Sequence, residues 1–499
     1  MQYVDIPKKI NIVDLLNNRA SFSPHNYKKV TLGKGDYKFV KDFISGDLIK
    51  GDEVGSDAYI SKSHKFFIRN KSLQPDSFSF SFSEDSVVPI LPDKFVNLHL
   101  KEGDIVISKD SNVGEVVILE KDYPDHMLSG GLYKMPVREN KYYLFAFLKH
   151  DFFKTQLNFL VSKGATIRHA KKLFLDCQIP LPPEKGRNGV IKFVETLVGA
   201  IIEKEKWIRV NEKKIFEIIE KELTDNQKAK SFSYRFPNLN DLQKTSRIDA
   251  GFYCESYIQK QFLMKNYIHD AGTIKDWGYD IGRGQNLQVS AIGKSIYSDK
   301  KRDGFYILVR PTNISDFGTV SKYEYLGSAQ GLSTISEGDI IFSAEGSIGK
   351  CIMFANPKEK LITNIHGIVL RKKNHNQIES AFVASFLRYL RKVGVLDYIS
   401  VGGQGGSLAM KYWSEVKIPF FPKNKQEEIA NLYHSSASYP TNKITGSNFE
   451  KIDADANKNF GILELDHQLR IMKEFLQTTI DKIVAGDKVK SDFSFVDNF

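Results

Sequence analysis

The chain has 499 residues, and its 71 lysines and arginines outnumber its 60 aspartates and glutamates, giving a formal net charge of +11. Apolar residues make up 41% of the sequence, which excludes a largely disordered chain. No apolar run reaches the roughly 18 to 20 residues of a membrane span, and the charged N-terminus lacks a secretory signal. We therefore expect a cytoplasmic protein of roughly two to four domains, with a polyanionic partner and no membrane contact.

The first part of the chain alternates short strands with a helix. Ile105 to Ser108 and Glu115 to Leu119 are rich in β-branched residues and are separated by glycine, aspartate and asparagine, which indicates strands joined by a turn. From Tyr142 to Val161 apolar residues recur at steps of three and four, which predicts a helix. A strand-like Ile-Pro-Leu-Pro-Pro run ends this part. We expect residues 1–185 to form an α+β domain.

A long helix with a narrow apolar stripe follows. The stripe consists of Val190, Val194, Leu197, Ile201, Ile208, Ile215 and Ile218, with glutamate and lysine at most other positions. A charged helix with a narrow apolar stripe needs a partner to bury that stripe in water. We expect residues 186–228 to form a central spacer helix, in which the stripe residues from Val194 to Ile215 set the spacing and present a docking surface for partners.

The second half of the chain repeats the first. Glu102-Gly103-Asp104 returns as Glu337-Gly338-Asp339 after 235 residues (339 − 104). The match continues in order through two later glycine motifs to the proline clusters, where the offset has grown to 239 residues (418 − 179). Such a slow drift fits small loop insertions in a duplicated domain. We expect residues 229–422 to form a second α+β domain of the same kind.

The last part of the chain contains a second striped helix. A short helix from Lys425 to Tyr433 precedes an insert at 435–459 that is rich in serine, asparagine and proline. Beyond the insert, apolar positions alternate by four and three residues, as in a coiled-coil seam, at Leu465, Leu469, Met472, Leu476, Thr479 and Ile483. We expect residues 423–485 to form a C-terminal helical spacer region, followed by a tail at 486–499. Antiparallel pairing of the two long helices predicts a dumbbell.

The usual catalytic motifs are missing from the sequence. Ala344 to Cys351 resembles a phosphate-binding loop, but alanine replaces its first glycine and cysteine replaces the residue that holds Mg²⁺. No histidines show a metal-ligand spacing, and there is no Asn- or Asp-Pro-Pro-aromatic motif of an amino-methyltransferase. Asp125 and Glu139 fit a loose nuclease pattern, yet their polar neighbours favour a solvated turn. We expect a non-catalytic chain that holds neither metal nor cofactor.

Several short motifs recur in a fixed order along the chain. They are the paired Gly-Asp strands, Gly-Ser-Ile-Gly-Lys at 346–350, the two Ile-Pro clusters, Arg-Ile-Asp-Ala-Gly-Phe-Tyr at 247–253 and Lys-Gln-Glu-Glu-Ile-Ala at 425–430. Together, over residues 19–485, they resemble the DNA-specificity subunit of type I restriction-modification systems. The first half departs from the pattern, because Arg19 to Pro24 match the Arg-Ile-Asp motif only loosely.

This resemblance implies a fold and a set of partners. Residues 1–185 and 229–422 would be two target recognition domains, each reading a few base pairs of a bipartite site in double-stranded DNA. The antiparallel helices between them would separate the half-sites and dock two methyltransferase subunits, which bind S-adenosylmethionine and methylate adenine. Motor-nuclease subunits would complete a phage-defence complex. The chain itself would supply DNA recognition and assembly.

No motif marks the side chains that contact DNA, so the candidates rest on charge and position. Arg69 and Arg310 follow the strand-like segments at 66–68 and 306–309, at matching places in the two halves. The other candidates for DNA binding are Lys163, Arg168, Arg283, Lys350 and Gln404, which lie in or near glycine-containing loops. An exposed charge, an ion pair or an ordinary turn explains each of them equally well.

Two other classes of function stay open. The chain could be a single-chain restriction endonuclease with Asp125 and Glu139 in its active site, or an RNA-binding scaffold. Cleavage of DNA by the purified chain with Mg²⁺ would favour the first class, and competition between duplex DNA and RNA would decide the second. The recognised bases, the gap and the role of the 435–459 insert do not follow from the sequence.

Overall fold

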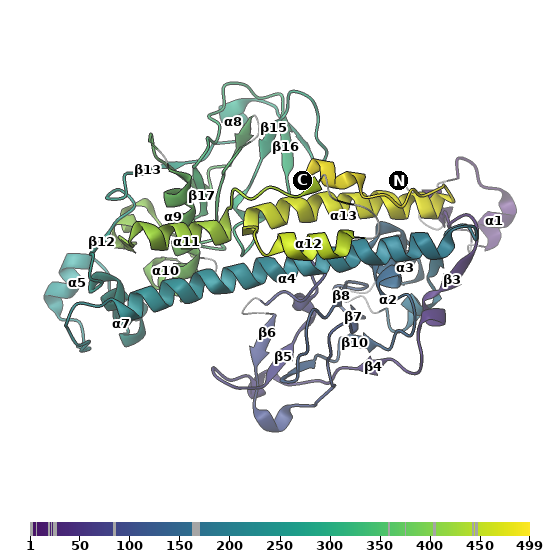
Figure 1. Ribbon diagram of the computed structural model, residues 1–499, viewed down its shortest axis with the longest axis horizontal. Coiled ribbons are helices and arrows are strands. Elements are labelled where there is room, and N and C mark those ends of the chain that lie inside the picture. The colour runs from purple at the N-terminus through teal and green to yellow at the C-terminus, as the bar shows by residue number, and fades with distance from the viewer. Residues whose placement is uncertain are drawn as a thin grey trace. The chain divides into compact units, whose positions relative to one another are not determined.

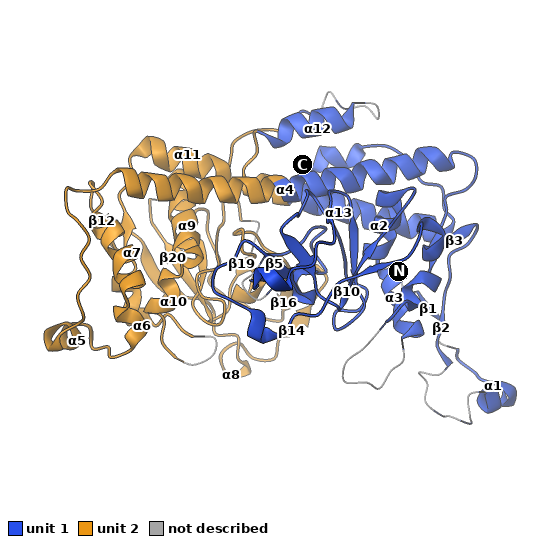
Figure 2. Ribbon diagram, turned by 90° about the horizontal axis from the view of Figure 1, so that it is seen from below, with its two compact units in different colours: residues 1–206, 439–458, 467–499 blue, residues 207–438, 459–466 orange. Residues whose placement is uncertain are grey.

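The structure is a computed structural model that describes residues 3–5, 7–17, 20, 22, 27–82, 86–161, 170–357, 360–374, 376–402, 406–441, 444 and 448–499. Figure 2 shows the division of the chain into two compact units. Unit 1 contains residues 1–206, 439–458 and 467–499, and unit 2 contains residues 207–438 and 459–466. Both units combine short strands with helices, which confirms the predicted α+β character.

The two largest sheets of unit 1 share its core. The main sheet is antiparallel, has the order β4-β10-β7-β8, and consists of β4 (Ile49–Lys50), β7 (Ile105–Ser108), β8 (Val116–Ile118) and β10 (Leu132–Met135). The second sheet has the order β6-β5-β9, with β5 (Phe66–Ile68), β6 (Val87–Pro89) and β9 (His126–Leu128). Strand β5 is antiparallel to β6 and parallel to β9. Apolar residues from both sheets, including Ile68, Val106 and Leu128, share one buried core.

Unit 1 also contains further short strands and helices. The strands and α-helices are β1 (Val4–Asp5), α1 (Ile12–Asn17), β2 (Lys29–Val30), β3 (Tyr37–Phe39), α2 (Lys141–Lys149), α3 (Asp151–Leu160) and β11 (Gln178–Pro180). The 3₁₀ helices are η2 (Val40–Phe43), η3 (Ser56–Ala58), η4 (Asn70–Ser72), η5 (Pro92–Lys94), η6 (Leu173–Asp176) and η10 (Ser494–Asn498). Strand β11 pairs with β3, so the proline cluster returns to the start of the repeat. We call residues 37–180 repeat 1.

Unit 2 repeats this topology and adds one strand, β14, to the second sheet. Its main sheet has the order β13-β20-β17-β18, with β13 (Asp280–Arg283), β17 (Ile340–Ser343), β18 (Cys351–Met353) and β20 (Gly367–Arg371). Its second sheet has the order β14-β16-β15-β19, with β14 (Ile296–Ser298), β15 (Tyr306–Leu308), β16 (Glu324–Gly327) and β19 (Leu361–Ile362). Strand β15 is antiparallel to β16 and parallel to β19, as β5 is to β6 and β9. The predicted duplication is therefore present in the strand topology.

Unit 2 also contains further helices and one further strand pair. They are α5 (Leu239–Thr245), α6 (Ala250–Tyr253), α7 (Glu255–Lys265), β12 (Ala271–Gly272), α8 (Val289–Ile292), η7 (Pro311–Asn313), α9 (Gln377–Lys392), α10 (Val395–Ile399), η8 (Met410–Glu415), β21 (Ile418–Pro419) and α11 (Lys423–Tyr433). Strand β12 pairs with β21 as β3 pairs with β11. We call residues 271–419 repeat 2.

Matched glycines explain why both repeats keep the same turn after strand β7 and after strand β17. Gly114 and Gly349 have φ angles of +83° and +87°. A Cβ atom at either position would lie 2.5 Å from a leucine side chain, Leu157 or Leu396. A residue with a side chain would be strained in this conformation and would also clash with the helix behind the turn.

Helix α4 (Arg187–Asp225) belongs to both units, and in unit 1 it packs against two further helices. The rings of Phe193 and Phe475 are in contact, while Lys204 bonds Gln468, so α4 and α13 (Ile462–Ala485) run antiparallel there. Thr196 bonds Glu450 and Lys204 bonds Asn457, so α12 (Phe449–Asn457) runs parallel to α4. In Figure 1 these three helices lie side by side. The 435–459 insert thus contributes a helix to the helical region.

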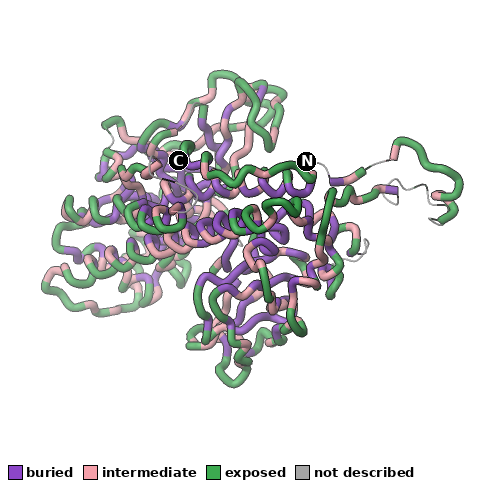
Figure 3. The backbone as a smooth tube through the Cα atoms, turned by 45° about the vertical axis from the view of Figure 1, so that its right-hand side comes forward, coloured by how far each residue is buried: buried purple, intermediate pink, exposed green. Residues whose placement is uncertain are grey.

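The predicted apolar stripes are buried. The buried positions include Val194, Leu197, Ile201, Ile208, Ile215, Leu465, Leu469, Met472, Leu476 and Ile483. Val190 and Ile218 are only half-buried, and Ile219 occupies the buried position instead of Ile218. Figure 3 shows buried residues inside the units and exposed residues along the loops. The stripes serve as helix cores, as their spacing predicts.

Candidate nucleic-acid interface

Arg69 and Arg310 occupy matching places in the two repeats. Each follows the central strand of the second sheet and precedes a single 3₁₀ turn. Arg310 donates from Nε to Oε2 of Glu324 at 2.6 Å, and its guanidinium lies 5.5 Å from the ring centroid of Tyr297. Arg69 is half-buried and is anchored by its backbone N–H, which donates to the carbonyl of Ser86 at 2.8 Å. The two arginines thus share a position in the repeats.

The edge strand of each main sheet runs on into a short segment that bridges the neighbouring loop, Asp52 with Ser129 and Gln285 with Asn364. Gly51 follows β4 and Gly284 follows β13. A Cβ atom on either glycine would lie 2.2 Å from a backbone oxygen, that of Ser129 or Asn364. These positions require glycine because the turn backbone packs directly against the neighbouring loop. We call residues 51–53 edge turn 1 and residues 284–286 edge turn 2.

The two edge turns present different side chains from this shared backbone. Edge turn 1 presents the exposed carboxylates of Asp52 and Glu53, whereas edge turn 2 presents the carboxamides of Gln285 and Asn286. Carboxylates accept hydrogen bonds from the amino group of cytosine, and carboxamides form paired hydrogen bonds with adenine. The edge turns therefore carry the residue types that read bases, with a different chemistry in each repeat.

Edge turn 2 also lines a hollow of about 990 Å³ in unit 2. Its walls include Gln285, Asn286, Gln330 and Lys360, and the described residues of the lining include no carboxylate. Lys360 donates to the carbonyl of Gly304 at 3.4 Å. The hollow thus offers carboxamide groups and one ammonium group to a ligand.

Arg283 directly precedes edge turn 2. Its guanidinium lies 3.7 Å from the carboxylate of Glu345, which also contacts His366 at 2.6 Å. The Arg283 side chain is 46% exposed, so solvent screens this pair and the arginine can reorient toward a phosphate group. Arg283 is thus the predicted DNA-binding residue that lies nearest to an edge turn along the chain.

Among the described contacts, no hydrogen bond or ion pair joins the other predicted residues of unit 2 to Arg283 or Glu345. Lys350 lies 3.2 Å from the carboxylate of Asp316, which Arg391 contacts at the same distance. Gln404 lies outside the described residues, as do Lys163 and Arg168 in unit 1. Their roles in DNA binding stay predictions.

Asp125 and Glu139 are engaged in separate surface ion pairs. Lys65 bonds Asp125 at 2.7 Å and Lys38 bonds Glu139 at 2.7 Å, and each lysine lowers the pKa of its carboxyl partner. In the described part of the chain, no group of three or more histidine, cysteine, aspartate or glutamate residues could hold a metal ion. The described helices also include none that is long and apolar enough to cross a membrane.

The Arg-Ile-Asp motif forms a buried clamp. Arg247 is 4% exposed and bonds both carboxylate oxygens of Asp249, at 2.8 and 2.6 Å. Its guanidinium also donates to backbone carbonyls at the end of α10 and lies 4.3 Å from the ring centroid of Phe252. The hydrogen bond from Arg247 lowers the pKa of Asp249. The motif therefore fixes the start of the second half to repeat 2.

Sequence reasoning missed two pairs of buried polar residues of α4. The pairs lie one heptad apart, Lys204 with Glu205 and Asn211 with Glu212. Lys204 donates to Asp453, Asn457 and Gln468 at 2.7, 2.7 and 2.8 Å. Burial lowers the pKa of Lys204, and the Asp453 carboxylate opposes this shift. The sequence signal for these residues was a polar pair beside the apolar stripe that recurs after seven residues.

Comparison with known proteins identifies the type of domain. The model of the type I restriction modification DNA specificity domain matches residues 27–212 and 284–435. Among solved structures, 22 chains match. None of the curated proteins matches.

Three of the matching structures illustrate the likeness. The type I restriction-modification S subunit from M. genitalium has 14% identity and a TM-score of 0.40, with 89% of this chain and 95% of that chain covered. The HsdS subunit from Thermoanaerobacter tengcongensis has 13% identity and a TM-score of 0.27, with 91% and 97% covered. A chain from a study of type I complex assembly and conformational transition has 13% identity and a TM-score of 0.28, with 92% and 100% covered.

Proposed function

The chain belongs to the type I restriction modification DNA specificity family, and from this premise we propose that it reads a bipartite site in duplex DNA, one half with each repeat. One observation carries this proposal. The two regions that the family model matches overlap two copies of one strand topology, whose edge turns present different polar side chains. Two copies of one reading surface with different chemistry suit two different half-sites.

Affinity and specificity come from different residues in this proposal. Contacts with phosphates supply most of the affinity, and the net charge of +11 suits them. Arg69, Arg283, Arg310 and Lys350 are the described candidates for phosphate or base contacts. The edge turns supply the groups that discriminate between bases.

The chemistry belongs to partner subunits in this proposal. Two methyltransferase subunits would bind S-adenosylmethionine and methylate adenine, while this chain addresses them to the site in the cytoplasm. Motor-nuclease subunits would join the same complex. The exposed sides of α4 and α13 are the docking surfaces that we propose for the methyltransferase subunits, because their other sides are occupied by the helix core.

The test is selection from a library of random duplex DNA. The purified chain, with a methyltransferase subunit from the same system, should enrich two short sequences separated by a fixed gap. Duplex RNA should compete poorly. Enrichment of a single uninterrupted sequence, or cleavage of DNA by the chain alone with Mg²⁺, would overturn the proposal.

A further inference from the structure

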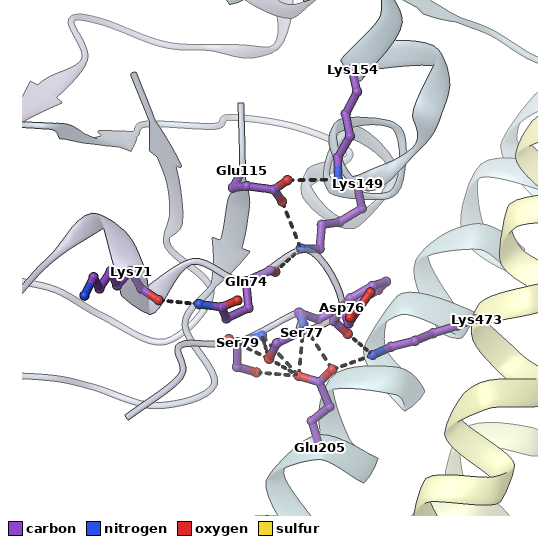
Figure 4. Close-up of polar contacts among 11 residues, drawn as sticks. Lys71, Gln74, Asp76, Ser77, Ser79, Glu115, Lys149, Lys154, Glu205 and Lys473 are labelled. Atoms are coloured by element: carbon purple, nitrogen blue, oxygen red, sulfur yellow. Dashed lines mark hydrogen bonds and ion pairs between the residues drawn. The ribbon is translucent and has the colours of Figure 1, made fainter. Parts of the chain in front are cut away.

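Glu205 is buried where repeat 1 meets helix α4. Its two carboxylate oxygens each lie 3.0 Å from the backbone nitrogen of Phe78, and Oε2 lies 3.1 Å from that of Ser79. The hydroxyl groups of Ser77 and Ser79 donate to the same oxygen at 3.2 and 3.3 Å (Figure 4). One carboxylate of the helix therefore holds a whole turn of repeat 1.

Helix α13 joins the same contact through Lys473. Its ammonium group lies 2.8 Å from Oε1 of Glu205 and also donates to the backbone carbonyl of Asp76. Figure 4 shows Lys473 reaching from its helix toward both groups. Because the Glu205 side chain is only 8% exposed, its charge depends on these donors rather than on water. The carboxylate thus connects α4, α13 and the turn at 76–79.

A buried lysine holds the same loop from its other side. Lys149 of α2 donates to the carbonyl of Gln74 at 3.0 Å and lies 3.9 Å from the carboxylate of Glu115. Burial lowers the pKa of Lys149 to about 7, although Glu115 opposes the shift. Lys154 completes the group with a 3.0 Å contact to Glu115. The loop at 74–79 is therefore fixed to repeat 1 as well as to α4.

Unit 2 has a corresponding contact one heptad further along α4. The two carboxylate oxygens of Glu212 accept from Nε and a terminal nitrogen of Arg388, both at 3.1 Å. The side chains are 8% and 2% exposed. Arg388 belongs to α9 and lies 4.3 Å from the ring centroid of Tyr433. Burial alone would lower the pKa of Arg388, but the Glu212 carboxylate raises it. Repeat 2 is therefore held by its own glutamate of α4.

The contacts of Glu205 and Glu212 fix where each repeat sits along α4, which the apolar stripe alone does not. Apolar side chains at heptad spacing pack almost equally well after a shift by one repeat. A shift of α4 would remove the donors from Glu205 and the guanidinium from Glu212, leaving unpaired charges in buried sites. Each repeat is thus held at one register of α4.

We propose that Glu205 and Glu212 are positioning residues that fix each repeat on α4 and thereby restrict the complex to one gap between its half-sites. This inference rests on the proposed function. One added base pair moves the second half-site by about 3.4 Å and turns it by about 35° around the DNA axis. A complex that rejects such a site must hold each repeat in one place on the helix.

The test measures how strictly the gap is selected. Glu205→Gln and Glu212→Gln each keep the size of the side chain and remove its charge. The variant chains, each with the methyltransferase subunit, select from random duplex DNA, and sequencing gives both the half-sites and the gap lengths. We expect the preference for the wild-type gap over gaps one base pair longer or shorter to fall about tenfold, with unchanged half-sites.

Matched controls lie outside α4 and α13, one in each unit. Glu139 is 43% exposed and pairs with Lys38, and Glu428 is 48% exposed and pairs with Lys425. Glu139→Gln and Glu428→Gln should keep the wild-type preference. If Glu205→Gln fails to fold, Lys473→Met removes the other charge of the same contact and takes its place. If Glu212→Gln fails to fold, Glu212→Gln combined with Arg388→Met, which leaves no unpaired charge, takes its place.

The outcomes separate this inference from the proposed function. A wild-type chain that enriches no bipartite site contradicts the proposed function itself. Wild-type selection of one gap, with the same strictness in both glutamine variants, overturns the positioning role. Altered bases in a half-site would also overturn it, because the glutamates would then act on base reading.

Discussion

The two repeats share a topology but are held on helix α4 by different chemistry. Glu205 takes its donors mainly from backbone N–H groups and serine hydroxyls of repeat 1, with one lysine from α13. Glu212 depends on a single arginine of repeat 2. Substitution of a side chain in repeat 1 leaves the backbone N–H donors to Glu205 in place, whereas substitution of Arg388 removes the donors to Glu212. The strand order of a duplicated domain can therefore stay the same while its attachment diverges.

The comparison predicts that unit 2 is the more sensitive of the two to a single change. Arg388→Met leaves the Glu212 carboxylate buried without its partner, which should lower the free energy of unfolding by about 3 to 5 kcal/mol. Denaturant titration of the full chain measures this loss. Adding Glu212→Gln to Arg388→Met should restore most of the stability, because no charge is then left unpaired.

A neighbouring arginine of the same helix provides the control. Arg391 is 33% exposed and pairs with Asp316 near the surface. Arg391→Met should cost less than about 1 kcal/mol, as surface pairs do. Equal losses of unfolding free energy in the two variants would show that the buried contact with Glu212 stabilises the chain no more than a surface ion pair does.

Unit 1 should respond less strongly to the loss of its glutamate charge. Glu205→Gln keeps an oxygen that can accept from the backbone N–H groups of Phe78 and Ser79 but loses the attraction to Lys473. We expect the free energy of unfolding to fall by about 1.5 to 3 kcal/mol, the usual value of hydrogen bonds to a charged group. The same titration measures it, and a loss larger than that of Arg388→Met would contradict the comparison.

The two repeats also differ in the side chains of their edge turns, and this difference can be removed by substitution. Asp52→Gln combined with Glu53→Asn gives edge turn 1 the side chains of edge turn 2. The half-site read by repeat 1 should change, with about 1 to 3 kcal/mol of altered discrimination at the affected base pair. The half-site of repeat 2 should stay the same in a selection from random duplex DNA.

Asp57→Asn is the control for this exchange, since Asp57 is an exposed carboxylate of the same repeat outside edge turn 1. It should leave both half-sites unchanged. An unchanged half-site in the exchanged variant would remove edge turn 1 from the list of base-reading segments.

Local patterns in the sequence predicted the repeats and the helix cores, but not the contacts that join them. The stripe from Val194 to Ile215 can be predicted from the sequence because the buried residues of a helix recur with the helical period of about 3.6 residues. Glu205 and Phe78 are 127 residues apart, and Glu212 and Arg388 are 176 apart. A helix rich in glutamate offers many candidates for such contacts, and only the tertiary structure selects among them. Helix α12 was missed because serine, asparagine and proline around it favour a loop.

Lys149, buried in unit 1, predicts that the free energy of unfolding rises with pH above neutrality. Lys149 has a pKa of about 7 in the folded chain and 10.5 as its ordinary value. Between these values the unfolded chain binds the proton and the folded chain does not, so stability rises with pH, by at most about 1.4 kcal/mol per pH unit. Lys149→Met should flatten the rise of the unfolding free energy between pH 7.5 and 9.5. Lys154→Met, which removes the more exposed partner of Glu115, should keep the rise. A slope that survives Lys149→Met would assign the pH dependence to another group.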